Sequence, residues 1–492
     1  MKNQVQLITY VDRLGGGGVA DLQALLAGPL RGVFGGVHLL PFFHPIDGSD
    51  AGFDPIDHTL VDPRLGNWAD LKALAGQTEV MADVIVNHMS SDSPQFRDYA
   101  AQGDASVHAG LFLTFDTVFP QGASAEDLLA IYRPRPGLPF TVATLPGAGK
   151  KILWTTFTPQ QVDIDVLHAQ GRTYLSGILR TLASNGIRMV RLDAVGYAIK
   201  KAGGSCFMMA ETFGFIDAFA AEAHALGIEV LVEIHAHHRR QIEIAARVDW
   251  VYDFALPPLV LHALFFGSAD PLKAWARMRP HNALTVLDTH DGIGIIDIGA
   301  DATDREAYPG LVPPAALDAL VDRIHTNSGG QSRSATGAAA SNLDLYQVNC
   351  TFFDAVARNP RDYLIARAVQ FFLPGVPQVY YVGLLAGEND MELLRRSGVG
   401  RDINRHRYGR DEIDAALGRP VVQALLALIR LRNTHPAFGG SFQLVDSAPS
   451  VLHLRWQLGA QRAELEVDFA QGRQRLQATG VDGGLQDHTP RG

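Results

Sequence analysis

Short apolar runs recur along this chain, and each is about the length of one β-strand. Continuous apolar runs are typical of strands buried on both faces, and helix-sized intervals between them favour parallel strands with crossover helices. We count about eight such runs, the number of parallel strands that closes a barrel. The expected strands are Val5–Asp12, Gly36–Phe43, Met81–His88, Ile187–Gly196, Ile228–His235, Val248–Leu256, Leu284–Asp291 and Val376–Val382. The pattern therefore predicts an α/β fold, a (β/α)8 TIM barrel.

Three amphipathic stretches predict crossover helices, at Thr173–Ala183, Phe215–Leu226 and Arg239–Val248. Two intervals, 89–186 and 292–375, are too long for a crossover, and both leave from carboxyl ends of strands, where barrel enzymes build their active sites. After residue 437, apolar and polar residues alternate, which predicts a small antiparallel β domain. The expected organisation is a catalytic barrel (domain A) in 1–85, 168–292 and 358–437, an inserted domain B in 86–167, a second inserted domain B′ in 293–357, and a C-terminal β domain in 438–492.

The composition narrows the class of protein. A chain of 492 residues with 47% apolar residues can bury a large core and carry insertions. The net charge of −10 argues against nucleic acid or an anionic membrane as a partner. No apolar run reaches the roughly 18 residues of a membrane span. The only cysteines are Cys206 and Cys350, and the N-terminus has the pattern of a strand and not of a signal peptide. We therefore expect a cytoplasmic protein.

Acidic side chains stand at the ends of three expected strands. Asp193 ends the fourth strand, Glu233 the fifth and Asp291 the seventh. Side chains at equivalent strand ends converge on the axis of a parallel barrel, so we expect these carboxyl groups in one pocket. Cleavage of a glycosidic bond with retention needs a carboxylate nucleophile and a carboxylic acid about 5–5.5 Å apart. The sequence predicts a glycosidic-bond enzyme, and the alternative is that each carboxylate only forms a structural ion pair.

The residues around these carboxylates suit the assignment. Arg191 precedes Asp193 by two positions and faces the same side of an ideal strand, where its charge should lower the pKa of the carboxyl group. Burial should raise the pKa of Glu233, as a general acid requires. His88 and His290 also end strands and can bind sugar hydroxyls, unless they are ordinary core histidines. The histidines are not at metal-ligand spacing and no cysteine is near them, so we expect no metal.

Several segments resemble those of a known enzyme family. Four of them are similar, in order, to the signature regions of the α-amylase clan of glycoside hydrolases: Asp83–His88, Arg191–Tyr197, Glu233 with its neighbours, and Leu287–Asp291. Six more resemble the sucrose phosphorylase-like subfamily of glycoside hydrolase family 13: Asp47–His58, Tyr132–Phe140, Phe157–Asp165, Thr289–Asp297, Ala335–Asn349 and Arg401–His406. The resemblance covers essentially the whole chain and fades only in the C-terminal part.

The resemblance implies reversible, retaining phosphorolysis of sucrose by inorganic phosphate, which gives α-D-glucose 1-phosphate and D-fructose, with glucosyl transfer to other acceptors as a side activity. In this interpretation Asp193 is the nucleophile that carries a β-glucosyl intermediate, Glu233 the general acid/base and Asp291 the transition-state stabiliser. The subfamily implies no cofactor and no metal, calcium included. Its members suggest a homodimer, although monomers also occur among them.

The resemblance also implies a set of substrate-binding residues. The glucosyl ring would be held by Asp50, His88, Arg191, His290 and Arg401 and walled by Phe53 and Phe157. The fructose or phosphate side would be formed by Arg135, Asp344, Tyr346 and Gln347, with Gln161, Tyr197 and His235 also lining the pocket. For Arg135, a solvated loop position is the alternative; for the two phenylalanines, it is core packing.

The small residues of Ser334–Asn342 would let the acceptor loop at Leu343–Gln347 adopt one arrangement for fructose and another for phosphate. Residues that bind glucose cannot distinguish related phosphorylases that use sucrose 6′-phosphate, glucosylglycerol or glucosylglycerate. A hydrolase with weak use of phosphate and a non-catalytic binding protein are the remaining alternatives. The retention of all three carboxylates disfavours the last.

Overall fold

The structure is a computed structural model of residues 1–492, and it describes all of them except 49, 135–136, 302–304, 337–346 and 491–492. Eight parallel strands form a closed barrel in the order β1-β16-β13-β12-β11-β10-β5-β2. The strands are β1 (Gln6–Thr9), β2 (Gly36–Leu39), β5 (Glu79–Ile85), β10 (Met189–Asp193), β11 (Glu229–Val232), β12 (Trp250–Asp253), β13 (Ala283–Thr285) and β16 (Val376–Tyr380). Each overlaps one of the eight apolar runs, so the predicted barrel is confirmed.

The register of two neighbouring strands decides which side chains meet at the mouth of the barrel. Met189 of β10 pairs with Glu229 of β11, and the same offset aligns Asp193 with Glu233. The Glu233 amide donates to the Leu192 carbonyl at 3.4 Å, which continues the ladder to this point. The two carboxyl groups are therefore neighbours although they are far apart in the sequence.

The strands end earlier than the apolar runs suggest. β11 ends at Val232 and β13 at Thr285, so Glu233 and Asp291 lie in the loops that follow their strands. Loops at the carboxyl ends of barrel strands carry the catalytic groups in this fold, and their apolar residues pack against the barrel, which explains why the run continues past the strand.

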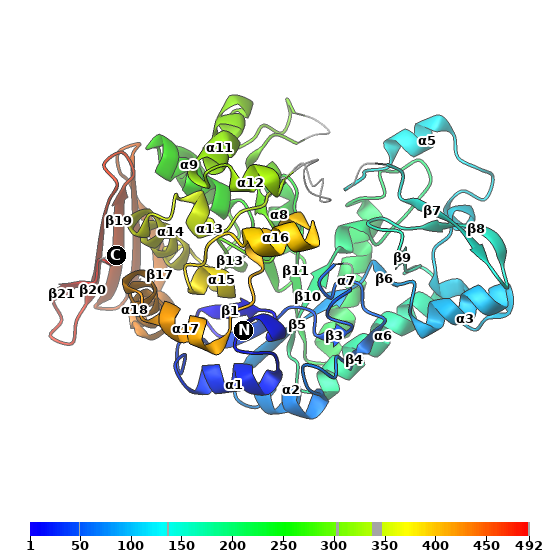
Figure 1. The fold of residues 1–492 in the computed structure, drawn as a ribbon. Helices are drawn as coiled ribbons and strands as arrows, with labels where there is room; N and C mark the ends of the chain where they lie inside the picture. The colour runs from blue at the N-terminus through cyan, green and yellow to red at the C-terminus, as the bar shows by residue number, and fades with distance from the viewer. Residues whose placement is uncertain (49, 135–136, 302–304, 337–346, 491–492) are drawn as a thin grey trace.

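Helices cover the outside of the barrel (Figure 1). The three predicted crossover helices are confirmed as α6 (Ala169–Ser184), α7 (Ala210–Ala225) and α8 (His238–Ala245). Others are α1 (Val19–Ala27), α2 (Trp68–Ala75), α9 (Leu256–Phe266), α10 (Asp270–Met278), α14 (Pro360–Phe372), α17 (Arg410–Leu417) and α18 (Pro420–Thr434). Among the residues that the structure describes, no helix combines the length and hydropathy of a membrane span.

Both long intervals fold into structure of their own. Between β5 and β10 lie β6 (His88–Ser90), α3 (Pro94–Gln102), α4 (Phe115–Val118), α5 (Ala125–Ala130), β7 (Phe140–Leu145), β8 (Gly149–Trp154) and β9 (Gln161–Asp163). This lobe projects from one side of the barrel in Figure 1. Between β13 and β16 lie β14 (Ile293–Gly294), η5 (Ile296–Ile298), α11 (Pro314–Asn327), α12 (Gln331–Ser334), β15 (Gln347–Val348) and α13 (Phe352–Ala355).

Residues 441–487 form an antiparallel sheet, which lies on the side of the barrel opposite the lobe (Figure 1). Its strands are β17 (Ser441–Val445), β18 (Val451–Leu458), β19 (Gln461–Asp468), β20 (Arg473–Thr479) and β21 (Leu485–Asp487). The Trp456 indole donates to the Phe372 carbonyl at 2.7 Å, and Lys273 donates to the Ala448 carbonyl at 2.6 Å. These two bonds connect the predicted C-terminal sheet to the barrel.

Candidate active site

A buried arginine organises the base of the site. Arg191 on β10 donates from Nη1 to Asp83 of β5 at 2.5 Å and to Asp193 at 2.9 Å. Both acceptors face the barrel interior, since Arg191 pairs in register with Asp83 and is two residues from Asp193. Ala194 has a φ of 55°, a conformation that costs energy for a residue with a side chain, and it turns the chain sharply after Asp193.

The carboxyl groups of Asp193 and Glu233 share the pocket. Their side chains are 15% and 13% exposed, so a ligand can reach both. Burial raises the pKa of each carboxyl group, and charge repulsion from Glu233 adds to the rise for Asp193, as repulsion from Asp291 does for Glu233. Arg191 donates directly to Asp193, whereas its Nη2 lies 3.7 Å from Glu233. This difference favours the charge on Asp193 and the proton on Glu233.

The expected effect of Arg191 on Asp193 needs a correction. Arg191 does favour the anion, but burial, Glu233, Asp83 and Asp291 outweigh it, and the pKa of Asp193 is raised well above its usual range. In the sequence, only Asp193 is seen next to Arg191, whereas in the folded pocket several carboxyl groups surround this one guanidinium. The expected rise in the pKa of Glu233 through burial is confirmed.

Asp291 is the carboxylate that stays ionised. Arg401 lies 2.9 Å from its Oδ1, and His290 lies 3.6 Å from its Oδ2. Burial disfavours the charge, but the guanidinium groups of Arg401 and Arg191 help to lower the pKa of Asp291 well below its usual range. A fixed negative charge beside a protonatable pair suits the stabilisation of a cationic transition state.

These groups line one pocket of about 720 Å³, its opening to solvent included. Twelve of the residues singled out in the sequence border it: Asp50, Phe53, His88, Phe157, Asp193, Tyr197, Glu233, His235, His290, Asp291, Gln347 and Arg401. They come from loops after most of the barrel strands and from both long intervals. The pocket has one carboxylate held ionised, two carboxyl groups with raised pKa values, and aromatic walls, and such a set of groups can support chemistry at a sugar carbon.

Comparisons with known proteins agree with this geometry. No model of a protein family matches the chain. The sucrose phosphorylase of Agrobacterium vitis is 61% identical over 480 residues, which are 98% of each chain. The sucrose phosphorylase of Bifidobacterium adolescentis is 54% identical over 473 residues, 96% of this chain and 93% of its own. This chain belongs to the sucrose phosphorylase family.

Two solved structures have a fold similar to that of this chain. The crystal structure of sucrose 6F-phosphate phosphorylase from Thermoanaerobacter thermosaccharolyticum matches with a TM-score of 0.90 and 36% identity over 99% of this chain and 98% of its own. An α-amylase from H. orenii matches with a TM-score of 0.65 and 13% identity over 95% of this chain and 90% of its own. The second likeness concerns the fold alone, and it confirms the α-amylase-like barrel.

Aromatic rings form the walls of the pocket in this family member. Phe53 stacks on His290, with ring centroids 4.8 Å apart and planes 9° apart, and the main-chain oxygen of Phe53 lies 2.9 Å from His88 Nε2. Phe157 contacts His88 edge to face at 5.2 Å and Tyr197 at the same distance. Burial lowers the pKa of His290 to about 3, so this ring is neutral and can bind hydroxyl groups without adding charge.

Five predicted residues do not line the pocket or are not described. Arg191 is not among the residues that border the pocket, but it donates to Asp193, which is. Gln161 on β9 is buried, and neither of its side-chain amide atoms has a hydrogen-bond partner among the described residues. Arg135, Asp344 and Tyr346 lie outside the described residues, as does most of the acceptor loop. Gln347 is placed, and its side chain accepts from the Gly292 amide at 3.2 Å, next to Asp291.

The pocket also contains residues that sequence reasoning missed. Ala194, Gly196, Phe207 and Ile234 border it. Phe207 packs on Tyr197 at 4.7 Å and stands between Cys206 and Met208, which both have positive φ angles. No motif marks this segment, and a strained backbone at non-glycine residues leaves no compositional signal. Asp83 was visible in the first signature region, but only its pairing with Arg191 reveals its place in the site.

The spacing of Glu233, His235 and Asp291 would allow them to bind a metal ion, because one side-chain oxygen or nitrogen atom of each lies within 4.8 Å of the others. Arg401 already pairs with Asp291 at 2.9 Å, and Arg191 lies 3.7 Å from Glu233. These fixed cations neutralise the carboxylates and would repel a metal ion. The cluster therefore fits a sugar-binding pocket better than a metal centre.

Proposed function

We infer that this chain is a sucrose phosphorylase, which transfers the glucosyl unit of sucrose to inorganic phosphate and releases D-fructose and α-D-glucose 1-phosphate. The observation that carries the inference is the convergence of Asp193, Glu233 and Asp291 on one pocket, in a chain with full-length similarity to sucrose phosphorylases. The reaction is reversible and retains the anomeric configuration, because two successive displacements at one carbon restore the starting geometry.

In the first displacement, Asp193 attacks the anomeric carbon of the glucosyl unit and the bond to the fructose oxygen breaks. Glu233 donates its proton to that oxygen, so that fructose leaves as a neutral alcohol. The direct hydrogen bond from Arg191 supports the charge on Asp193, and the raised pKa of Glu233 supports its role as the proton donor. Asp291 stabilises the positive charge that develops on the sugar ring.

In the second displacement, a phosphate oxygen attacks the same carbon and the bond to Asp193 breaks. Glu233, now ionised, accepts the proton that the phosphate gives up, and α-D-glucose 1-phosphate forms. Phosphate is an anion that must enter a pocket with three carboxyl groups, so cationic side chains have to offset the repulsion. His235 borders the pocket beside Glu233, and Arg135, outside the described residues, is a further candidate.

We propose the following binding roles. The glucosyl ring is held by Asp50, His88, Arg191, His290 and Arg401, between Phe53 and Phe157. The acceptor side is formed by Gln161, Tyr197, His235 and Gln347, together with Arg135, Asp344 and Tyr346, which lie outside the described residues. The position of most of these side chains at one pocket supports the assignment. For Gln161, support comes from a buried amide that has no hydrogen-bond partner in the part of the chain that the structure describes.

The direct test is to incubate the protein with sucrose, with and without phosphate, and to measure glucose 1-phosphate, fructose and free glucose. A phosphorylase forms glucose 1-phosphate in step with fructose when phosphate is present. Release of free glucose at equal rates in both mixtures would identify a hydrolase. In the reverse direction, glucose 1-phosphate is offered with fructose, fructose 6-phosphate, glycerol or glycerate, and a preference for any acceptor other than fructose would refute the assignment to sucrose.

The domain boundaries predicted above, the cytoplasmic location and the homodimer stay predictions. The lobe between β5 and β10 and the segment between β13 and β16 both contribute to the pocket, through Phe157 and Gln347, which supports their proposed role as inserted domains that wall the active site. Size-exclusion chromatography with light scattering would decide between a monomer and a dimer.

A further inference from the structure

His235 is held in one orientation by two contacts that the mechanism above does not use. Its Nδ1 lies 3.1 Å from Asp297 Oδ2, and its ring stacks on Phe254 with centroids 3.9 Å apart. A side chain on residue 294 would prevent this arrangement: a Cβ added to Gly294 would lie 2.3 Å from the Asp297 carboxylate and 3.0 Å from His235 Nδ1. Gly294 thus provides the space in which the two residues meet.

Asp297 itself is fully buried in η5 and is fixed by its surroundings. Its Oδ1 accepts from the Ala236 amide at 3.3 Å and from Gln241 Nε2 at 3.0 Å, while its Oδ2 faces His235. A buried carboxylate with these partners is costly unless a positive charge lies close by. The only side chain with a titratable proton in direct contact with it, among the described residues, is His235.

The other ring nitrogen of His235 points toward the reacting groups. His235 Nε2 lies 3.7 Å from Glu233 Oε1. His235 also lines a second cavity, with Met208, Met209 and Ile296, which adjoins the catalytic pocket. The ring therefore stands beside the proposed general acid/base and borders both cavities.

The charged groups around His235 favour its protonated form. Burial opposes a charged imidazole, but the Asp297 carboxylate and its hydrogen bond, followed by Glu233 and Asp291, raise the pKa of His235 above its ordinary value. Arg401 is a cation in the same pocket, and like His235 it acts to lower the pKa of Glu233. With Nδ1–H committed to Asp297, an imidazolium has one remaining donor, Nε2–H.

We propose that Asp297 is a positioning residue that holds His235 as an imidazolium with Nε2–H directed at the acceptor, so that the glucosyl-enzyme reacts with phosphate in preference to water. The proposal rests on the proposed function and concerns its second displacement. Fructose leaves as a neutral molecule and depends on Glu233, whereas phosphate arrives as an anion and depends on a local positive charge. Loss of the Asp297 charge should therefore affect the two half-reactions unequally.

The test is Asp297→Asn, which keeps the shape of the side chain and removes its charge. We expect the KM for phosphate to rise about tenfold, the loss of one charge-assisted hydrogen bond, while the KM for sucrose changes less than about twofold. The ratio of free glucose to glucose 1-phosphate should rise at a fixed phosphate concentration. Because Asp297 raises the pKa of His235, the rate of the phosphate half-reaction in the variant should decline at a lower pH than in the wild type.

Two further variants keep the test decisive. Gly294→Ala separates the two side chains without changing either, and it should reproduce the defect toward phosphate. Asp318→Asn changes an exposed carboxylate on α11 to an amide and serves as the matched control. Circular dichroism shows whether Asp297→Asn folds. If it does not fold, the KM of Gly294→Ala for phosphate decides whether the proposal holds.

The proposal would be overturned by an unchanged KM for phosphate in the folded variants, by equal losses for sucrose and phosphate, or by an unshifted pH profile. These outcomes differ from failure of the proposed function, because in that case the wild type itself would form no glucose 1-phosphate.

Discussion

Replacement of Arg191 by methionine tests whether the buried arginine is the charge that makes the site possible. The Arg191 side chain is 2% exposed and lies 2.5 Å from Asp83, 2.9 Å from Asp193 and 3.7 Å from Glu233. Methionine fills similar space, but it removes the guanidinium from Asp193 and leaves Asp83 beside the His38 ring. Removal of one partner from a buried ion pair costs about 3–5 kcal/mol, and we expect the free energy of unfolding to fall by at least this amount near neutral pH.

The pH dependence of this loss gives the sharper criterion. In the wild type, burial raises the pKa of Asp83 but Arg191 and His38 outweigh it, so the pKa is lowered and the contribution to stability is lost as the pH falls through it. In the variant, the same carboxyl groups have raised pKa values and take up protons on folding. Its stability should therefore increase as the pH falls, and the difference from the wild type should narrow between about pH 8 and about pH 5.

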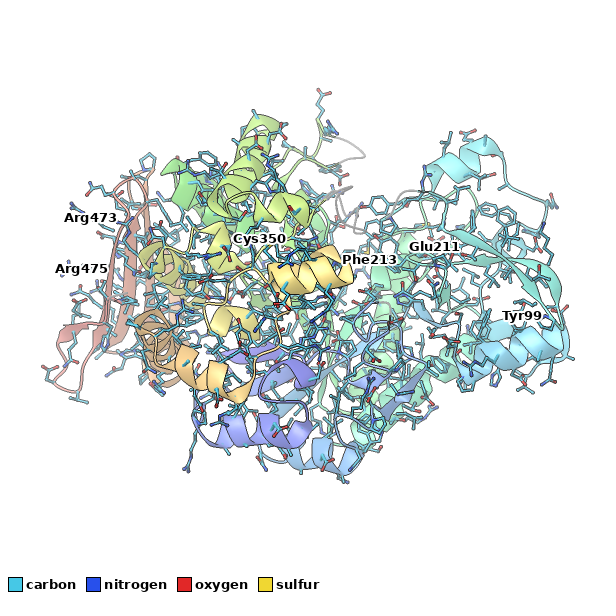
Figure 2. All side chains as sticks on the ribbon, viewed as in Figure 1. Tyr99, Glu211, Phe213, Cys350, Arg473 and Arg475 are labelled. Carbon is cyan, nitrogen blue, oxygen red and sulfur yellow. The ribbon has the colours of Figure 1, made fainter. Side chains whose placement is uncertain are left out.

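Urea unfolding followed by tryptophan fluorescence at several pH values measures this difference. The control is Arg475→Met, because Arg475 is exposed on β20, and Figure 2 shows it on the C-terminal sheet far from the lobe. A loss no larger than that of the control, or a difference that widens as the pH falls, would show that Arg191 does not neutralise these carboxylates.

Three other substitutions separate chemistry from stability. Asp193→Ala should lower turnover of sucrose by at least about 10⁴-fold with an unchanged far-UV circular dichroism spectrum, and an active variant would remove Asp193 from the mechanism. Glu233→Gln should lower turnover of sucrose by about 10²–10⁴-fold but spare glucosyl fluoride, whose leaving group needs no proton; an equal loss for both substrates would contradict the acid role. In the wild type, the rate of the sucrose half-reaction should decline as the pH rises through the raised pKa of Glu233, and Glu233→Gln should abolish this decline. Trp456→Phe removes the bond to the Phe372 carbonyl and should cost about 1–3 kcal/mol of stability with unchanged kcat, whereas a changed kcat would couple the C-terminal sheet to the site.

The amino-acid sequence by itself determined the barrel and the chemistry of its mouth. Apolar runs of strand length record burial on both faces, and that pattern is local, so all eight strands and three crossover helices could be predicted. Asp193, Glu233 and Asp291 could be assigned to one pocket because a parallel barrel brings equivalent strand ends together whatever their separation in sequence.

Only the tertiary structure decided how these groups act on one another. The pKa of Asp193 depends on how many carboxyl groups the fold places around Arg191. The sequence neighbours of Arg191 show fewer of these groups than the folded pocket contains. The contact between His235 and Asp297 joins the loops after two different strands, and the space for it exists because residue 294 has no side chain. Phe207 enters the pocket from a strained segment without a motif. Distance and burial set the strength of charge interactions, and both are properties of the folded chain.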